Sequence, residues 1–158
     1  MIITKNEQKF LLDWIFKNEH RFLPNEMGKH RKYFILNEAE NFPNLFLEIK
    51  QRILNKENIT EWIPDPFFGD RIMYNETNGY IHEHIDPTLE SKNHLRFNLF
   101  LSKPFHGGDP IYNGELIPFE ERCYLKYLVN EYYHASLPVI GKKPRISISY
   151  GILIDRGA

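Results

Sequence analysis

The sequence is poor in cysteine, the residue that cross-links many small domains, because Cys123 is the only one in 158 residues. A single thiol excludes an intrachain disulfide framework and a cysteine-rich zinc site. No apolar run approaches the roughly 20 residues that span a bilayer, and the N-terminal segment is too polar for a signal peptide. We therefore expect a cytoplasmic protein with no membrane partner.

An excess of charge of one sign is also absent. Lys and Arg number 20 and Asp and Glu number 21, which gives a formal net charge of −1. This balance argues against a protein held mainly by bulk charge to nucleic acid, so no nucleic-acid partner is expected. Linkers and internal repeats are lacking too, and the chain is predicted to form one domain over residues 1–158.

The first part of the chain has a helical pattern, and residues 1–57 are predicted to form a helical support. Thr4 and Glu7 make a capping box that begins a first helix. A second helix is predicted over residues 43–56, since a proline at position 43 suits a first helical turn. A short strand is expected at 32–36, between the two helices.

The second part, residues 58–158, contains short strand patterns separated by turns, which predicts a mainly β core. Apolar and polar residues alternate most clearly at 94–101 and 145–152, and further strands are expected at 70–75 and 122–129. The apolar faces are expected to pack under the helices. The other faces carry Arg, Asn, Ser and His, and they either point into a barrel mouth or form an ordinary wet sheet face.

The seven histidines are the residues best suited to carry chemistry. His84-x-Asp86 supplies an imidazole and a carboxylate, and both can reach one ion from the end of a strand. Alone this pattern is weak, because a surface histidine and a turn aspartate before Pro87 would look the same. His134, further along the chain, is a candidate third ligand, and the alternative for it is a core histidine bonded to the backbone.

A candidate anion-binding pair opens the last predicted strand. Arg145 and Ser147 are two residues apart, so they share a strand face and present a guanidinium beside a hydroxyl. That arrangement suits a carboxylate. The alternative is that Arg145 extends the basic turn formed by Lys142 and Lys143. Together with three candidate metal ligands, the order and spacing favour one site over separate coincidences.

In combination these residues resemble the Fe(II)/2-oxoglutarate-dependent dioxygenases, most closely the prolyl-hydroxylase-like branch. The resemblance covers roughly residues 70–152 and rests on Tyr74, Gly79-Tyr80, His84-x-Asp86, Gly107-Gly108, His134 and Arg145-x-Ser147. It implies a double-stranded β-helix, or jelly roll, with helices packed on the major sheet. It also implies hydroxylation of a C–H bond in a prolyl or other peptide or protein residue, or in a small molecule, with release of succinate and CO2.

The resemblance assigns the Fe(II) ligands to His84, Asp86 and His134. His82-x-His84 is a competing pair, as in a cupin-like metalloenzyme that does not use 2-oxoglutarate, but the glycine and glutamate spacings around it miss the cupin pattern. A non-catalytic jelly-roll binding module, in which the histidines are structural, is the other alternative.

The resemblance also implies a 2-oxoglutarate site. Arg145 would hold the C5 carboxylate, Ser147 and Tyr74 would donate hydrogen bonds, and Asn98 is expected to line the pocket. O2 is the other co-substrate, and ascorbate is expected to act as a stimulant. Residues 61–69, rich in proline and aromatics, form either a core-packing loop or one wall of the site.

Overall fold

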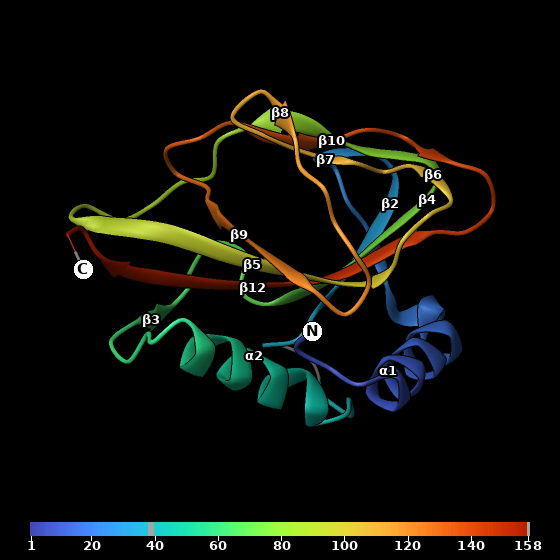
Figure 1. Ribbon diagram of the computed structural model, residues 1–158, viewed down its shortest axis with the longest axis horizontal. Coiled ribbons are helices and arrows are strands. Elements are labelled where there is room, and N and C mark those ends of the chain that lie inside the picture. Colours follow the sequence, from blue (N-terminus) through green and yellow to red (C-terminus); the bar gives the residue numbers. More distant parts are fainter. Residues whose placement is uncertain (38–39, 158) are drawn as a thin grey trace.

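The computed structural model describes residues 1–37 and 40–157, and it has two α-helices beneath a curled antiparallel sheet (Figure 1). The helices are α1 (Lys5–Lys17) and α2 (Leu45–Lys56), and a 3-10 turn, η1 (Glu19–Arg21), follows α1. None of the described helices combines the length and apolar character needed to cross a membrane. The predicted class, mainly β with N-terminal helices, is confirmed.

The sheet runs in the order β8-β7-β10-β4-β12-β5-β9, with β2 also on β4, β1 on β2 and β3 on β12, while β6 and β11 form a separate pair. The strands are β1 (Leu23–Pro24), β2 (Gly28–Ile35), β3 (Ile63–Pro64), β4 (Arg71–His84), β5 (Lys92–Ser102), β6 (His106–Gly107), β7 (Pro110–Tyr112), β8 (Glu115–Leu116), β9 (Tyr124–Leu128), β10 (His134–Ser136), β11 (Val139–Ile140) and β12 (Arg145–Asp155).

The helices form where the sequence predicts them. At the start of α1 the Thr4 amide donates to the Glu7 carboxylate at 3.0 Å, and the Glu7 amide donates to the Thr4 hydroxyl at 3.1 Å, which completes the capping box. The helix buries Leu11 and Ile15 against the sheet. Helix α2 begins two residues after Pro43, whose carbonyl accepts a hydrogen bond in the turn that precedes the helix.

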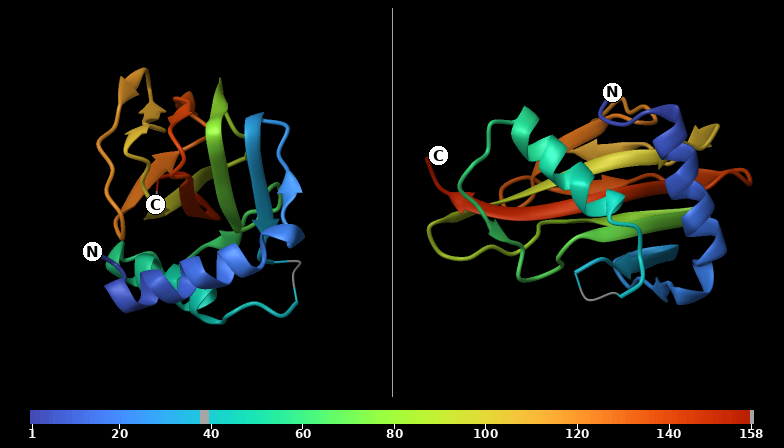
Figure 2. Two further views of the ribbon diagram at one scale, coloured as in Figure 1. Left: turned by 90° about the vertical axis from the view of Figure 1, so that its right-hand side faces the viewer. Right: turned by 90° about the horizontal axis from the view of Figure 1, so that it is seen from below.

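The core lies between the two helices and the face of β5 and β12 that looks toward them (Figure 2). Each fully buried aliphatic or aromatic side chain here contributes roughly 1.5–3 kcal/mol of hydrophobic free energy. The residues that β5 and β12 contribute to this core are those of the predicted apolar faces: Leu95, Phe97, Leu99, Leu101, Ile146, Ile148, Tyr150 and Ile152. The opposite faces of the same strands line a cavity, so of the two alternatives the barrel mouth is confirmed.

Strand β4 is longer than predicted. The sequence indicates a strand over residues 70–75 that ends in a turn, but the structure continues the strand to His84. At the predicted turn, Asn78 adopts the left-handed backbone conformation, at φ 68°, without ending the strand. The next residue is a glycine, and a Cβ on Gly79 would collide with the His30 carbonyl. Strand β12 pairs with the first half of β4, β10 pairs with its second half and β2 pairs with both, so β4 links the helix-backed layer to the opposite layer.

Candidate metal centre and anion-binding cavity

The three predicted metal ligands meet where β4 pairs with β10. His84, the last residue of β4, lies opposite His134, the first residue of β10, and Asp86 follows two residues later. The Nε2 atoms of His84 and His134 lie 3.1 and 3.5 Å from the Asp86 carboxylate. One ligand atom from each residue falls within 4.8 Å of the others. This spacing allows one ion to contact all three.

Backbone carbonyls orient both imidazole rings. His84 Nδ1 lies 2.6 Å from the carbonyl of His82, and His134 Nδ1 lies 3.2 Å from that of Tyr132. Because a carbonyl oxygen only accepts, each Nδ1 donates, and each Nε2 faces the Asp86 carboxylate, where loss of its proton would present a lone pair to a metal. This tautomer is the one in which histidine binds a metal through Nε2.

Asp86 is buried and stays ionised. Its amide donates to the Val129 carbonyl at 2.9 Å, which fixes the backbone just after β4. Burial alone would raise the pKa of Asp86, but hydrogen bonds from His134 and His84 outweigh it and hold that pKa well below its usual range. Burial would lower the pKa of His84, yet the hydrogen bond to Asp86 raises it overall. The carboxylate is therefore in its ligand form at neutral pH.

A β-bulge decides which histidine of His82-x-His84 faces the centre. The register places His84 opposite the first residue of β10 and Ile81 opposite Ser136, so three steps along β4 match two along β10. Ile81 and His84 line the cavity, whereas His82 is exposed and lies outside the cluster of three. The geometry gives no support to a site built on the His82-x-His84 pair.

Arg145 is buried in the same cavity, and no carboxylate of residues 1–37 and 40–157 forms an ion pair with it. The side chain is 5% exposed, and its Nε has no hydrogen-bond partner. The guanidinium carbon lies 5.2 Å from the ring centre of Phe100 and 5.9 Å from that of Phe119. Burial lowers the pKa of Arg145, although Tyr127 and Asp109 oppose the effect. An uncompensated buried cation is costly, so this position favours an anionic ligand.

Other polar groups around Arg145 lack partners as well. Ser147 and Asn98 line the cavity, and so does Tyr127, which the sequence analysis did not select. The Tyr127 hydroxyl and Asn98 Oδ1 are buried and influence each other, but neither meets a hydrogen-bond partner of good geometry in the described part of the chain. Burial raises the pKa of Tyr127 to about 12 against the influence of Arg145, so its hydroxyl remains a donor at neutral pH. The cavity has about 860 Å³ of space, counted to its open mouth, which suits a small ligand.

Tyr74 is not part of this cavity, contrary to the prediction. Its ring lies in the hydrophobic core on the helix side of β4, and its hydroxyl donates to Glu19 at 3.0 Å. The cavity-facing residues of this stretch are Met73 and Asn75, which flank it. The motif interval pointed to Tyr74, but the bend near Asn78 changes the phase between this stretch and His84.

Sequence reasoning also missed Arg31 and Asn75. Both line the cavity, where Arg31 is 7% and Asn75 is 2% exposed. The sequence did offer a signal for Asn75, because it is the polar residue directly after Tyr74, which was predicted to bind 2-oxoglutarate. Arg31 precedes the apolar stretch of β2 and follows a register shift after Lys29, which a sequence pattern does not reveal.

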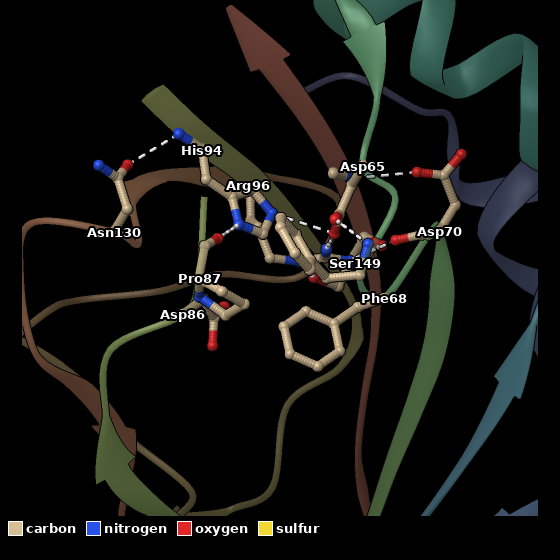
Figure 3. A network of polar contacts seen from close by, with 12 residues as sticks. Asp65, Phe68, Asp70, Asp86, Pro87, His94, Arg96, Asn130 and Ser149 are labelled. Carbon is tan, nitrogen blue, oxygen red and sulfur yellow. Dashed lines mark hydrogen bonds and ion pairs between the residues drawn. The ribbon is translucent and has the colours of Figure 1, made fainter. Parts of the chain in front are cut away.

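A buried polar network lies beside Asp86 of the candidate metal centre (Figure 3). His94 Nε2 lies 3.0 Å from the Asp65 carboxylate, and His94 Nδ1 lies 2.8 Å from the carbonyl of Pro87, the residue after Asp86. Arg96 also pairs with Asp65. The stretch 61–69 therefore has both expected roles, because Asp65 anchors this network while Phe68 lines the cavity.

Comparisons by sequence found no match, either among models of protein families or among curated proteins. Comparisons by structure found close likenesses. A prolyl-4-hydroxylase from Pseudomonas putida is 14% identical, with a TM-score of 0.68 over 99% of this chain and 90% of that one. A prolyl hydroxylase from Trichoplax adhaerens, in complex with a peptide fragment of the oxygen degradation domain of hypoxia inducible factor, is 9% identical, with a TM-score of 0.73 over 99% and 81%.

HygX from Streptomyces hygroscopicus, with nickel and 2-oxoglutarate bound, is 8% identical, with a TM-score of 0.69 over 96% of this chain and 79% of that one. The chain therefore has the jelly-roll fold of the 2-oxoglutarate oxygenases of prolyl-hydroxylase type, as the sequence predicts.

Proposed function

We propose that this protein is an Fe(II)- and 2-oxoglutarate-dependent oxygenase that hydroxylates a C–H bond. One observation carries the proposal: His84, Asp86 and His134 converge in the cavity that also buries Arg145 without a counter-charge. A metal triad alone fits many enzymes, and a buried arginine alone fits many anions. Their combination in one cavity suits a metal that is chelated by a dicarboxylate.

The metal-ligating residues suit Fe(II). Two imidazoles and one carboxylate on one side of an ion form the facial triad typical of non-haem iron oxygenases, which leaves positions open for co-substrates. His84 and His134 would bind through Nε2, since their Nδ1 atoms are held by backbone carbonyls. Asp86 would supply the negative charge, and its fixed amide limits how far it can move.

The residues around Arg145 suit one end of 2-oxoglutarate. Arg145 would pair with the C5 carboxylate, with Ser147 beside it on the same face of β12 and Tyr127 as a further donor. Asn98 stays a candidate pocket residue. When bound, Fe(II) and 2-oxoglutarate would reduce O2 with four electrons, two from the co-substrate and two from a substrate C–H bond, giving succinate, CO2 and an alcohol. The protein's own task is to orient both reactants and exclude water.

The class of substrate is a further part of this proposal. The Trichoplax neighbour holds a peptide, and the Pseudomonas neighbour is a prolyl-4-hydroxylase, which supports a prolyl or other peptide or protein residue. The size of the cavity also admits a small molecule. We expect no nucleic-acid substrate, since the chain has a net charge of only −1.

The test is succinate formation by the purified protein with Fe(II), 2-oxoglutarate, O2 and ascorbate. We expect slow succinate release without substrate, and none from an Arg145→Gln variant at 2-oxoglutarate concentrations that suffice for the wild type. Loss of one partner of a buried charge pair costs about 3–5 kcal/mol, so the KM for 2-oxoglutarate should rise at least about 100-fold. The matched control is Arg156→Gln, an exposed arginine. A wild-type protein that binds no divalent metal would refute the proposal.

A further inference from the structure

Two arginines flank one asparagine across the cavity wall. The strand register pairs Arg31 of β2 with Asn75 of β4, and it pairs Arg145 of β12 with the same Asn75. Residues directly opposite in antiparallel strands carry their side chains on one face, and all three line the cavity. Of the two arginines, only Arg145 has a role in the proposed binding of 2-oxoglutarate.

The hydrogen bonds that Arg31 makes with the described residues go to neutral groups. Its Nε donates to Asn75 Oδ1 at 3.3 Å, and its Nη1 donates to Asn25 Oδ1 at 2.9 Å. A guanidinium has five N–H donors, so the rest of its Nη1/Nη2 edge stays available. No carboxylate among residues 1–37 and 40–157 forms an ion pair with Arg31.

Asn75 supplies a second unused donor at the same place. Arg31 occupies its Oδ1, which settles the orientation of the amide, and its buried Nδ2 has no hydrogen-bond partner. A buried amide nitrogen without a partner is costly. A ligand that brings oxygen acceptors between Asn75 and Arg31 would satisfy both groups.

The charges in the cavity leave Arg31 without an anion. Burial lowers the pKa of Arg31 to about 9, and repulsion from Arg145 and Arg71 adds to this effect. Asp86 is committed to the candidate metal ligands, while Arg96 is paired with Asp65. Of the two carboxylates of 2-oxoglutarate, one would bind the metal and the other Arg145. A further carboxylate would be needed to neutralise Arg31.

We propose that the primary substrate carries a carboxylate, which the Nη1/Nη2 edge of Arg31 and the amide of Asn75 bind. This inference rests on the proposed oxygenase function and names the substrate class for the same cavity. The planar edge of a guanidinium matches a carboxylate with two parallel hydrogen bonds, and the asparagine adds a third donor. The carboxylate belongs either to a free amino acid or other small acid, or to the C terminus of a peptide.

The first experiment uses the wild-type protein with Fe(II) and 2-oxoglutarate and measures succinate above the level without substrate. The probes are matched pairs: each common amino acid beside its carboxamide, and N-acetylated peptides without Asp or Glu, with a free C terminus beside the same peptides amidated. We expect at least one acid to stimulate succinate formation, and its amide to be about tenfold less effective or worse, since one lost charge-assisted hydrogen bond accounts for that factor. Which acids respond separates free amino acids from chain ends.

The second experiment compares variants on the acid that the first identifies. Arg31→Gln should raise the KM for that acid about tenfold or more, and Arg31→Lys less, because the lysine keeps the charge but loses the planar edge. The Kd of 2-oxoglutarate on the Mn(II)-loaded protein should not change. Lys29→Gln, which removes an exposed positive charge from the same strand, is the matched control and should alter neither constant.

Several results would overturn the inference. Amides that stimulate as well as acids would do so, as would a protein that makes succinate but responds to no carboxylate probe. If Arg31→Gln weakened 2-oxoglutarate binding instead, Arg31 would belong to the co-substrate site. Because the comparison of acid with amide uses only the wild-type protein, it tests the inference even if Arg31→Gln does not fold. Failure of the proposed oxygenase function gives a different result, namely no binding of Mn(II) and 2-oxoglutarate and no succinate at all.

Discussion

At the scale of single residues, the candidate centre is organised by tying the second bonding position of each ligand to the backbone. His84 and His134 each direct Nδ1 to a carbonyl, and the Asp86 amide donates to Val129. The atoms that face the centre are those without a backbone partner. Such support orients the ligands before a metal arrives, which reduces the reorganisation needed on binding.

Asp86→Asn tests the negative ligand with little change of shape. We expect it to weaken Mn(II) binding by more than about 100-fold, because even residues that only support a ligand account for 10- to 100-fold. Turnover of 2-oxoglutarate should fall to background. Titration of Mn(II) followed by electron paramagnetic resonance measures the affinity. Asp155→Asn, which removes an exposed carboxylate paired with Lys92, is the control, and an equal loss in that variant would contradict the assignment.

Tyr127 and Tyr74 are expected to respond in opposite ways to the same substitution. Tyr127→Phe should raise the KM for 2-oxoglutarate by about 2- to 10-fold, the worth of one neutral hydrogen bond. It should change the free energy of unfolding of the unliganded protein little, because the buried hydroxyl meets no hydrogen-bond partner of good geometry among the described residues. Tyr74→Phe should lower the free energy of unfolding by about 1 kcal/mol through loss of the bond to Glu19.

Two measurements on both variants check this contrast: urea unfolding and 2-oxoglutarate affinity on the Mn(II)-loaded protein. If Tyr74→Phe weakened 2-oxoglutarate binding and Tyr127→Phe did not, Tyr74 and not Tyr127 would be the residue that donates to 2-oxoglutarate.

At the scale of elements, irregular pairing sets the site as much as the strands themselves do. The bulge between β4 and β10 turns His84 inward and leaves His82 exposed. The register shift between β2 and β4, next to His30 with its φ of 51°, precedes Arg31. Bulges commonly redirect side chains beside active sites, and here each one directs a polar side chain into the cavity.

Gly79 is the residue that makes the second irregularity sterically feasible. A Cβ there would collide with the His30 carbonyl and lie 2.7 Å from the Glu76 carbonyl, so neither backbone could stay in place. Gly79→Ala should therefore lower the free energy of unfolding by about 1–3 kcal/mol. It should also impair any ligand that depends on Arg31. Urea unfolding and the KM for an active carboxylate probe measure the two effects.

Gly114→Ala is the control, since Gly114 has open space around it and its substitution is strained only by a positive φ, 78°, which Gly79 does not have. It should lose some stability but leave metal and substrate binding intact. If Gly79→Ala behaved in the same way as this control, the link between the register shift and Arg31 would be wrong.

The same irregularities explain which parts of the site the sequence could predict. His84, Asp86 and Arg145 were found because each belongs to a short motif whose spacing survives folding. Tyr74 lies outside the cavity because the strand between it and His84 is irregular at Asn78, and counting residues does not give the face of a strand across such an irregularity. Arg31 was missed because its role depends on which strand it pairs with.

At the scale of the whole molecule, the helices form a platform for one wall of the cavity. The alternation in β5 and β12 was enough to predict which face packs on the helices, because burial of one face is a local requirement. The strand pattern left a barrel mouth and an ordinary wet sheet face as alternatives, and only the family resemblance implied a jelly roll, since pairing between distant strands leaves no periodic signal. Lys50 of α2 adds a buried ion pair with Asp70, which ties the platform to the residue before β4.

Glu7 ties the two helices of this platform together, and its titration should be visible in the stability of the whole protein. Both carboxylate oxygens accept from Arg52 of α2, at 3.0 and 2.7 Å, and this pairing lowers the pKa of Glu7 to about 2 from an ordinary 4.5. A folded-state pKa below the unfolded value stabilises the protein above about pH 4.5, and the contribution disappears as the pH falls toward 2.

Glu7→Gln keeps a residue that can complete the capping box but removes the charge. Urea unfolding should therefore show the wild type to be more stable than Glu7→Gln at pH 7, with the difference shrinking steadily below pH 4.5. Glu115→Gln, an exposed glutamate, should match the wild type at each pH. A difference for Glu7→Gln that stayed constant from pH 7 to pH 3 would show that the ion pair between the helices does not contribute.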